Sequence, residues 1–559
     1  MKPQSDVAEF LAYRPLRAPQ GDRTVLLHPP PVLIPAVVQR NIAGKAESAP
    51  AAGMPFDGEW LREARGEFVR AALAWTGRYT DIGWADHLSE QAACGRAPLL
   101  LAGHQTEMFH PGVWFKNAVL AAAARSVGGL GINILIDGDS PKTTAVRVPT
   151  GVDGRPVVLS VFPDRSASGL PYEEQFVRDW ECFQGFADRV HELIAPLVPA
   201  TMVRDYWTLV RSRAAENRHL PWSLAQARHM LEGEWGWRTL EVPQSVVCDL
   251  PGFAAFAVFL WSRAETFSCI HNRVLAQYRR IHRIRTDARP MPDLKRHDDW
   301  WEAPFWIWSA DEPKRRRIQI RRAGRCIQIS DGVSTLGYLR EDDFAGAAAW
   351  WGDLRRKGFK IRGRALITTM WARMVLGDMF FHGIGGAKYD QVTDAVMYEF
   401  FGFRPPEFGI ASATVRLPVA ADRLASVPPA DPRELRQKMR QMIYHPERFL
   451  RPDDFSDAER ERVSAIVAEK RRWVQTPKTP NNAAERHRAI TEANRKLGEL
   501  LAREREHSMQ EIAAAEERAR DAAILSSREF AFCLYPESYL REFFESQLQS
   551  LTRRSYPGE

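Results

Sequence analysis

The chain has 559 residues, of which 45% are hydrophobic, and this length is enough for about three to four domains. Its net charge of +7, from 77 basic and 70 acidic residues, is mild for this length and does not argue for nucleic-acid binding. The six cysteines form no CxxC pair, which argues against a zinc ribbon or a disulfide scaffold. The amino terminus does not read as a signal peptide, and the longest apolar runs are too short to span a membrane. We therefore expect a cytoplasmic protein with no nucleic-acid or membrane partner.

Residues 1–170 are predicted to form an amino-terminal segment and the first half of a parallel-sheet core. Prolines between residues 29 and 35 break up an apolar stretch, which predicts an extended segment there. Helical spacing of apolar residues follows over 56–75.

The most informative stretch is 98–149, which predicts a strand, a helix and a second strand. Leu99–Ala102 is a short apolar run typical of a strand buried on both faces, and 113–125 is an alanine-rich, buried helix. Asn133–Ile136 then reads as the second strand, so the unit has the length of a parallel crossover. Polar residues follow both strands, where ligands bind in open α/β sheets, so we expect a site here.

Two histidines, His104 and His110, are predicted to lie in the loop after the first strand. They suit an acid–base or phosphate-contacting pair, and the alternative is two loop histidines with ordinary hydrogen bonds. Two histidines without a third ligand are weak evidence for zinc, so we expect no metal site of this kind. Lys116 follows early in the helix, where it faces the site or is solvated.

Asp137, Asp139 and Lys142 follow the second strand. They suit the binding of Mg²⁺ or of an amine substrate. The alternative is a capped turn, because aspartate and serine favour turns in any case.

Residues 171–290 carry helical periods with many aromatic residues, and we expect a helical insertion there. The second half of the core is predicted over 291–425. It begins with a β-hairpin around residues 323–324, followed by a helix that ends near Lys357.

Residues 364–402 predict a helix to about Gly377, a strand over 379–382 and a further helix starting near Lys388. A strand, a glycine turn and a helix form an arrangement in which helix N-terminal amides bind an anion. A tight turn into a helix explains the glycines equally well. The candidate anion and substrate residues of this turn are Gly383, Gly385, Gly386, Lys388, Tyr389 and Asp390.

Residues 426–528 are rich in charge and poor in glycine, which predicts a long antiparallel helical hairpin or coiled coil. Ser456 and Glu459 make a capping box, and a second helix is expected over 483–525. The hairpin faces are either solvated surface or the interface of a homodimer. The last segment, 529–559, is apolar again and is expected to pack on the core.

Together these motifs resemble the bacillithiol-synthesis cysteine-adding enzymes, a family of cysteine ligases. The family has a GQQ-type loop, a phenylalanine, a Pro-Gly pair and a helix with a lysine, and the matching residues here are Gly103, His104, Gln105, Phe109, Pro111, Gly112 and Lys116. Its acidic loop matches 136–139, and its Gly-Gly turn matches Gly385 and Gly386. The resemblance implies that His104, His110 and Gln105 are catalytic, and that Gly103 and Lys116 bind the cofactor.

The resemblance also implies a Rossmann-like core similar to class I nucleotidyltransferases, with a coiled coil that dimerises. This chain departs from the family at His104, in the acidic loop 137–142 and in the 171–290 insertion, so the substrate is less well supported than the fold.

The resulting hypothesis is a ligase that joins an amino acid or small amine to a small acceptor. The candidate cofactor is ATP or ADP with Mg²⁺, although the sequence has no Walker-type loop. The alternative is a non-catalytic binding protein or dimeric scaffold on the same core, and a weaker one is a nucleotidyltransferase.

Overall fold

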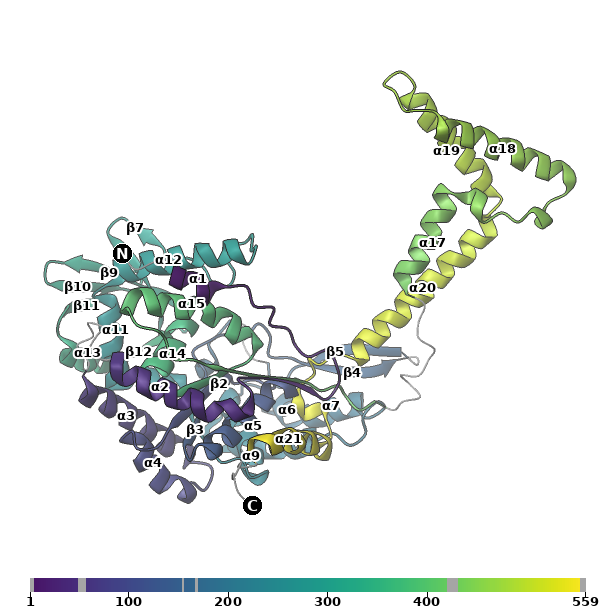
Figure 1. The fold of residues 1–559 in the computed structure, drawn as a ribbon. Helices are drawn as coiled ribbons and strands as arrows, with labels where there is room; N and C mark the ends of the chain where they lie inside the picture. The colour runs from purple at the N-terminus through teal and green to yellow at the C-terminus, as the bar shows by residue number, and fades with distance from the viewer. Residues whose placement is uncertain (1–4, 49–56, 153–154, 166–168, 420–430, 553–559) are drawn as a thin grey trace, which may run out of the picture. The chain divides into compact units, whose positions relative to one another are not determined.

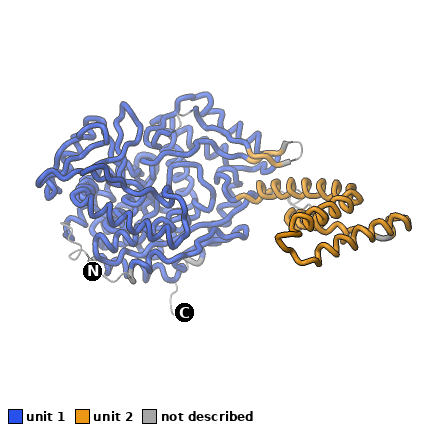
Figure 2. Tube along the Cα trace, turned by 90° about the horizontal axis from the view of Figure 1, so that it is seen from above, with its two compact units in different colours: residues 1–148, 159–418, 528–559 blue, residues 149–158, 419–527 orange. Residues whose placement is uncertain are grey.

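A computed structural model describes residues 5–48, 57–152, 155–165, 169–419 and 431–552 (Figure 1). The chain divides into two compact units, which Figure 2 shows in different colours. Unit 1 comprises residues 1–148, 159–418 and 528–559, and unit 2 comprises 149–158 and 419–527.

A six-stranded sheet is the centre of unit 1. Its order is β1–β14–β13–β2–β3–β6, and the last five strands are parallel, whereas β1 runs antiparallel to β14. The strands are β1 (Thr24–His28), β2 (Leu99–Gln105), β3 (Leu130–Ile136), β6 (Leu240–Pro243), β13 (Met379–His382) and β14 (Gly409–Thr414). Numbered along the chain, the parallel strands stand in the order 3-2-1-4-5, so the order reverses between β2 and β13. The predicted α/β class with a parallel sheet is confirmed.

The first predicted crossover is present, with its strand longer than expected. Helix α5 (Pro111–Ser126) joins β2 to β3, and β2 extends to Gln105 because residues 103–105 pair with 134–136 of β3. His104 and Gln105 therefore lie in the strand, and the prediction of a loop at His104 is wrong.

The prediction of an extended segment over 29–35 is also wrong. A single 3₁₀ turn, η1 (Pro31–Leu33), leads there into helix α2 (Ile34–Ser48). Proline is tolerated in the first turn of a helix, where its missing N–H has no intrahelical partner. Helices α3 (Gly58–Thr76) and α4 (Asp86–Ala93) follow, and Asp57 caps α3 through the amides of Glu59 and Trp60.

The region predicted as a helical insertion also contains β6, the third parallel strand. Its short sequence, LEVP, lies between helices and carries too little periodicity to be recognised. The helices of this region are α6 (Trp180–Gln184), α7 (Phe186–Ile194), α8 (Val203–Asn217), α9 (Leu220–Glu234), α10 (Gln244–Cys248), α11 (Pro251–Trp261) and α12 (Ala264–Ile281).

A second, antiparallel sheet has the order β11–β10–β9–β8–β12, with β7 pairing with β8. The predicted hairpin is confirmed as β9 and β10, in which Cys326 pairs with Ala323 across Gly324. The strands are β7 (Arg296–His297), β8 (Trp300–Ser309), β9 (Arg316–Ala323), β10 (Cys326–Ser330), β11 (Thr335–Arg340) and β12 (Phe359–Gly363). A separate two-stranded sheet pairs β4 (Val146–Val152) with β5 (Arg155–Val161).

The second half of the parallel sheet follows the expected pattern with one shift. Helix α13 (Phe344–Arg356) is capped by Asp343, and α14 (Ala365–Trp371) continues through a π-helical turn to Leu376. Helix α15 (Ile384–Phe401) begins four residues before the predicted start at Lys388, so Gly385 and Gly386 lie in its first turn.

Unit 2 contains four described α-helices, α17 (Pro432–Tyr444), α18 (Asp457–Gln475), α19 (Ala483–Glu499) and α20 (Ala502–Leu525). The capping box of Ser456 and Glu459 is confirmed. The predicted continuous helix over 483–525 is interrupted at Leu500 and Leu501, and α18 packs on α19 while α17 packs on α20.

The carboxyl-terminal segment belongs to unit 1. Helix α21 (Glu537–Thr552) packs on α5, where Phe544 contacts Trp114 and Phe115. Among the described residues, no single helix has the length and apolar composition to cross a membrane, although α11 and α12, bent by 80° at their junction, meet these criteria as a pair.

Candidate functional site

A cavity of about 350 Å³ opens beyond the carboxyl ends of β2 and β3. Its wall combines apolar side chains with a few polar ones, as ligand pockets generally do. The polar lining residues include His104, Thr106, Glu107, His110, Tyr172 and Gln175, and the apolar ones include Phe109, Val113, Leu220 and Leu224. The structure thus brings both predicted catalytic histidines to one cavity.

The imidazole of His104 is held neutral. Its Nδ1 lies 3.2 Å from the backbone oxygen of Gln105, which places the proton on Nδ1 and leaves the Nε2 lone pair free to accept a hydrogen bond. Burial lowers the pKa of His104 to about 3, and the nearby charge of Lys116 adds to the effect. At neutral pH this side chain is therefore an acceptor and carries no charge.

His110 caps helix α5. Its Nδ1 accepts from the amide of Gly112 at 3.1 Å, and its Nε2 lies 3.3 Å from Nη2 of Arg528 and 3.8 Å from a carboxylate oxygen of Glu529. Burial lowers the pKa of His110 to about 4, against the opposing effect of Glu529. The cap fixes the ring, and Nε2 lies between the side chains of Arg528 and Glu529 at the cavity wall.

Glu107 and Tyr172 form a pair that the sequence analysis missed. The Tyr172 hydroxyl donates to Oε2 of Glu107 at 3.0 Å, and Tyr172 is buried whereas part of Glu107 is exposed. Burial of the carboxyl group raises the pKa of Glu107, and the charge of Asp139 raises it further. Glu107 lies within the loop between the two histidines, so its position next to them was visible in the sequence; its partner Tyr172 was not.

Thr106 adds an unused hydrogen-bonding group to the cavity wall. Its Oγ1 is buried and has no partner in the described part of the chain, although the residue lines the cavity. A buried hydroxyl without a partner is costly, so it favours a ligand or a water at this point.

Gln105 and Asp139 are brought together at the edge of the sheet. Nε2 of Gln105 donates to Asp139 at 3.3 Å, and Arg315 of the second sheet pairs with the same carboxylate at 2.8 Å. The carboxylate of Asp139 is thus already paired with the guanidinium of Arg315. Lys142 lies exposed in the loop beyond it.

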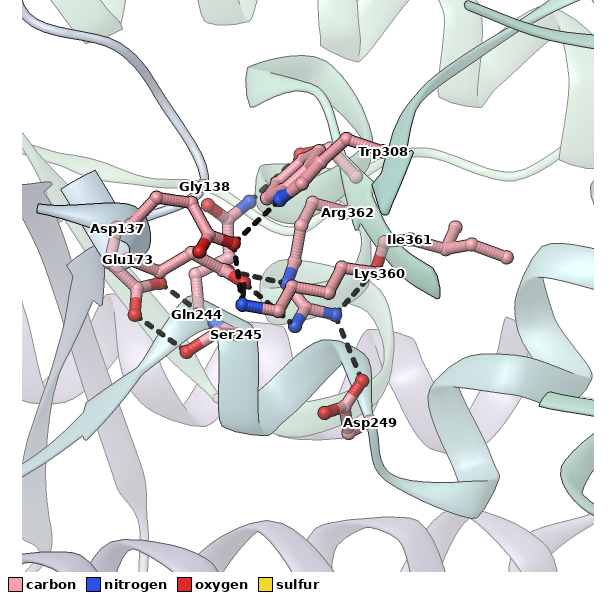
Figure 3. A network of polar contacts seen from close by, with 12 residues as sticks. Asp137, Gly138, Glu173, Gln244, Ser245, Asp249, Trp308, Lys360, Ile361 and Arg362 are labelled. Carbon is pink, nitrogen blue, oxygen red and sulfur yellow. Dashed lines mark hydrogen bonds and ion pairs between the residues drawn. The ribbon is translucent and has the colours of Figure 1, made fainter. Parts of the chain in front are cut away.

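Asp137 lies inside a buried polar network (Figure 3). It is fully buried, and it accepts from the amide and hydroxyl of Ser245 at 2.8 and 2.6 Å and from the Trp222 indole at 3.1 Å. Burial raises the pKa of Asp137 to about 7, and the charge of Glu173 adds to the effect. The structure therefore places Asp137 where it joins β3 to α10, away from the cavity lining.

The centre of this network is Arg362 of β12. Its guanidinium donates to Glu173 at 2.7 Å and to Asp249 at 2.9 Å, and Lys360 lies 3.3 Å from Glu173 (Figure 3). Glu173 lies in the turn Tyr172–Glu174, so the network ties the turn that carries Tyr172 to the second sheet.

Lys116 is buried in α5, and its ammonium donates to the backbone oxygen of Gly103. Burial lowers its pKa to about 7, with a further effect of Arg228 opposed by Glu232. Arg228 itself bridges Glu232 and Glu241, both buried. Lys116 thus lies behind β2, outside the cavity lining.

The residues predicted at the Gly383 turn lie at the carboxyl end of β13, next to β2 in the sheet. Lys388 and Tyr389 are exposed, whereas Asp390 is buried and pairs with His382 and Arg373. Gly383 offers no side chain to cap α15, so the first amides of this helix remain open. His382 is a further residue that the sequence analysis missed.

Within the described ranges, no group of three or more histidine, cysteine or carboxylate side chains is arranged to hold a metal ion. Mg²⁺ in nucleotide sites is held by one or two carboxylates together with phosphates. Of the described carboxylates at this edge, Asp139 is paired with Arg315, and Glu107 accepts a hydrogen bond from Tyr172.

No protein-family model matches the chain, and no curated protein matches it significantly.

Proposed function

We propose that this chain is an enzyme of the ligase type, which joins an amino acid or another small amine to a small acceptor. The observation that carries the proposal is the cavity beyond β2 and β3, where His104, Glu107 and His110 face one space. The reversal of strand order between β2 and β13 supports a Rossmann-like core, because doubly wound sheets bind ligands at such a point.

The polar lining of the cavity suits an incoming ammonium group. Glu107 and Glu529 supply carboxylates, and the neutral His104 supplies an acceptor. An ammonium nitrogen must lose a proton before it attacks an electrophile, and Glu107, with its raised pKa, is the better proton acceptor of these groups. His104 then orients the amine through its Nε2 lone pair.

The second ligand of the proposed reaction is an anionic group, which binds at the N-terminus of α15. Free amides at a helix start favour phosphate or carboxylate oxygens, and Lys388 in the second turn adds a point charge. ATP or ADP with Mg²⁺ is the cofactor that we propose for this edge.

A thermal-shift screen tests the proposal. We expect ATP, ADP or AMP with Mg²⁺ to raise the melting temperature by several degrees, because a ligand that binds only the folded state stabilises it. The nucleotide shift should be lost in Lys388→Ala, and any shift with an amino acid should be lost in His104→Ala. Both should be retained in the controls His87→Ala and Lys478→Ala, which alter exposed residues. Amino acids, cysteine among them, and sugar–malate conjugates complete the screen, and no shift with any ligand would contradict the proposed enzyme.

We also infer that unit 2 pairs two copies of the chain. Val474, Leu500 and Met509 are large apolar residues of unit 2 with 51%, 45% and 57% of their surface exposed, and we propose that they lie in the interface between the two copies. Sedimentation of the full chain should show a dimer that Val474→Glu or Met509→Glu dissociates, whereas the control Lys478→Glu leaves it intact. A monomeric wild-type chain would contradict this inference and the scaffold alternative together.

A further inference from the structure

A buried histidine ends β13 and lies beside the first turn of α15. His382 is only 7% exposed, and its Nε2 lies 2.8 Å from Oδ2 of Asp390. Asp390 also accepts from Arg373 at 2.6 Å, and its contacts with His382 and Arg373 keep its pKa below the usual range despite its burial. An ionised carboxylate only accepts hydrogen bonds, so Nε2 of His382 carries the ring proton. Burial also lowers the pKa of His382, so the ring is neutral and Nδ1 has a free lone pair.

This lone pair faces the open turn of α15. A Cβ atom at Gly386 would lie 2.7 Å from Nδ1 of His382, which shows how closely the ring approaches the helix. Within the described residues Nδ1 has no hydrogen-bond partner, because the one hydrogen bond of the ring is to Asp390. His382 is therefore a buried acceptor directed at a helix N-terminus.

The turn itself has unused donors. The first intrahelical bond runs from the amide of Ala387 to the oxygen of Gly383 at 3.0 Å, so the amides of residues 384–386 precede it. Side chains are absent at Gly383 and Gly385, where a Cβ atom would meet nothing within 4 Å. Three amide donors and one imidazole acceptor thus lie at the first turn of α15, beside the space left open at Gly383 and Gly385.

We propose that this turn binds hydrogen phosphate and discriminates it from sulfate. This proposal rests on the proposed function. A ligase that converts ATP to ADP releases inorganic phosphate, and we infer that this phosphate is the anion bound at the turn. The amides of residues 384–386 donate to the unprotonated oxygens, and Nδ1 of His382 accepts the remaining hydroxyl hydrogen.

Sulfate fits this site poorly because it carries no hydrogen at neutral pH. One of its oxygens would face the lone pair of Nδ1, which leaves a buried acceptor without a partner. A phosphate monoester loses its last hydroxyl hydrogen near pH 6, so free phosphate is also preferred to the monoester of AMP.

The charged side chains around the turn are compatible with a bound anion, because the nearest carboxylate is already paired. Asp390 is paired with Arg373, which also lies 2.7 Å from Asp394, and burial raises the pKa of Asp394 to about 7. Lys388 is exposed at the second turn of the helix, and the helix dipole adds partial positive charge.

Calorimetric titration of the full chain with sodium phosphate and with sodium sulfate at pH 7.5 tests the proposal. We expect sulfate to bind roughly ten- to a hundredfold more weakly than phosphate, which is the effect of one unpaired buried acceptor. Equal affinities would overturn the inference and leave the anion site of the proposed function in place. Binding of neither ion, with ATP and Mg²⁺ still raising the melting temperature, would overturn the inference alone.

His382→Phe keeps a ring between Phe380 and Phe408 and removes the acceptor. We expect this variant to lose the preference for phosphate, whereas the matched control His271→Phe, at another buried histidine, keeps it. Should His382→Phe fail to fold, nitrogen-15 spectra of histidine in the wild-type chain decide the question. A proton on Nε2 and an Nδ1 signal that moves with phosphate and not with sulfate support the proposal, and a proton on Nδ1 overturns it.

Discussion

Replacing Arg362 with methionine is expected to lower the free energy of unfolding by about 3–5 kcal/mol. The guanidinium is buried, and it donates to Glu173 at 2.7 Å and to Asp249 at 2.9 Å (Figure 3). Methionine matches the stem of arginine and leaves both carboxylates without their main counter-charge, which is the costly way to break a buried ion pair. Urea denaturation followed by circular dichroism measures the change.

The matched control is Arg321→Met. Arg321 also lies on the second sheet, its side chain is 36% exposed, and its ion pair with Asp299 is on the surface. We expect a loss below about 1 kcal/mol for this variant, because exposed ion pairs contribute little. A similarly small loss for Arg362→Met would show that Lys360, 3.3 Å from Glu173, or water replaces the missing charge.

Replacing His104 with alanine is expected to reduce amine-dependent ADP formation by at least about a hundredfold, with little change in melting temperature. The ring makes one hydrogen bond, to the oxygen of its neighbour Gln105, and an edge contact with Phe109, so its removal disturbs little packing. Its Nε2 lone pair is the feature that the proposed reaction uses. Equal losses of activity and stability would instead assign His104 a structural role, and release of pyrophosphate without ADP would indicate a nucleotidyltransferase.

The pH dependence of stability gives the same variant a second readout. The pKa of His104 is about 3 in the folded chain and about 6.5 in an unfolded one. Between these values the unfolded state binds the additional proton, so folding stability rises with pH across this window. Removing His104 should make the rise shallower by at most about 1.4 kcal/mol per pH unit, as acid denaturation from pH 3 to 7 would show. An unchanged slope would contradict a neutral, buried His104.

Local patterns in the sequence determined much of the parallel core. The apolar run after Pro98 predicted β2, the alanine-rich segment predicted α5, and the strand at 379–382 with its glycine turn predicted β13 and a following helix, although α15 begins four residues before the predicted start. These signals are local. A strand that is buried on both faces appears as an uninterrupted apolar run, and the start of a helix is marked by residues that cap its first amides or leave them open. The observed end of β2 differs from the predicted one because residues 103–105 pair with β3, which places His104 in the strand.

Only the tertiary structure decided which polar groups meet. Glu173 and Arg362 are 189 residues apart, and Tyr172 reaches Glu107 from a different segment, so no periodicity or spacing links them. The sequence correctly predicted that Asp137 follows a strand. It could not distinguish a carboxylate that binds a ligand from one that is buried in a hydrogen-bond network, because both are aspartates after a strand. The burial of Asp137 against Ser245 and Trp222 depends on α10 and α9, which belong to the region predicted as a helical insertion. Hydrogen bonds and charge pairs between distant segments form only when the chain has folded. For this reason the partners of Glu107 and Arg362 came from the structure alone, whereas His104 and His110 of the cavity were predicted from the sequence.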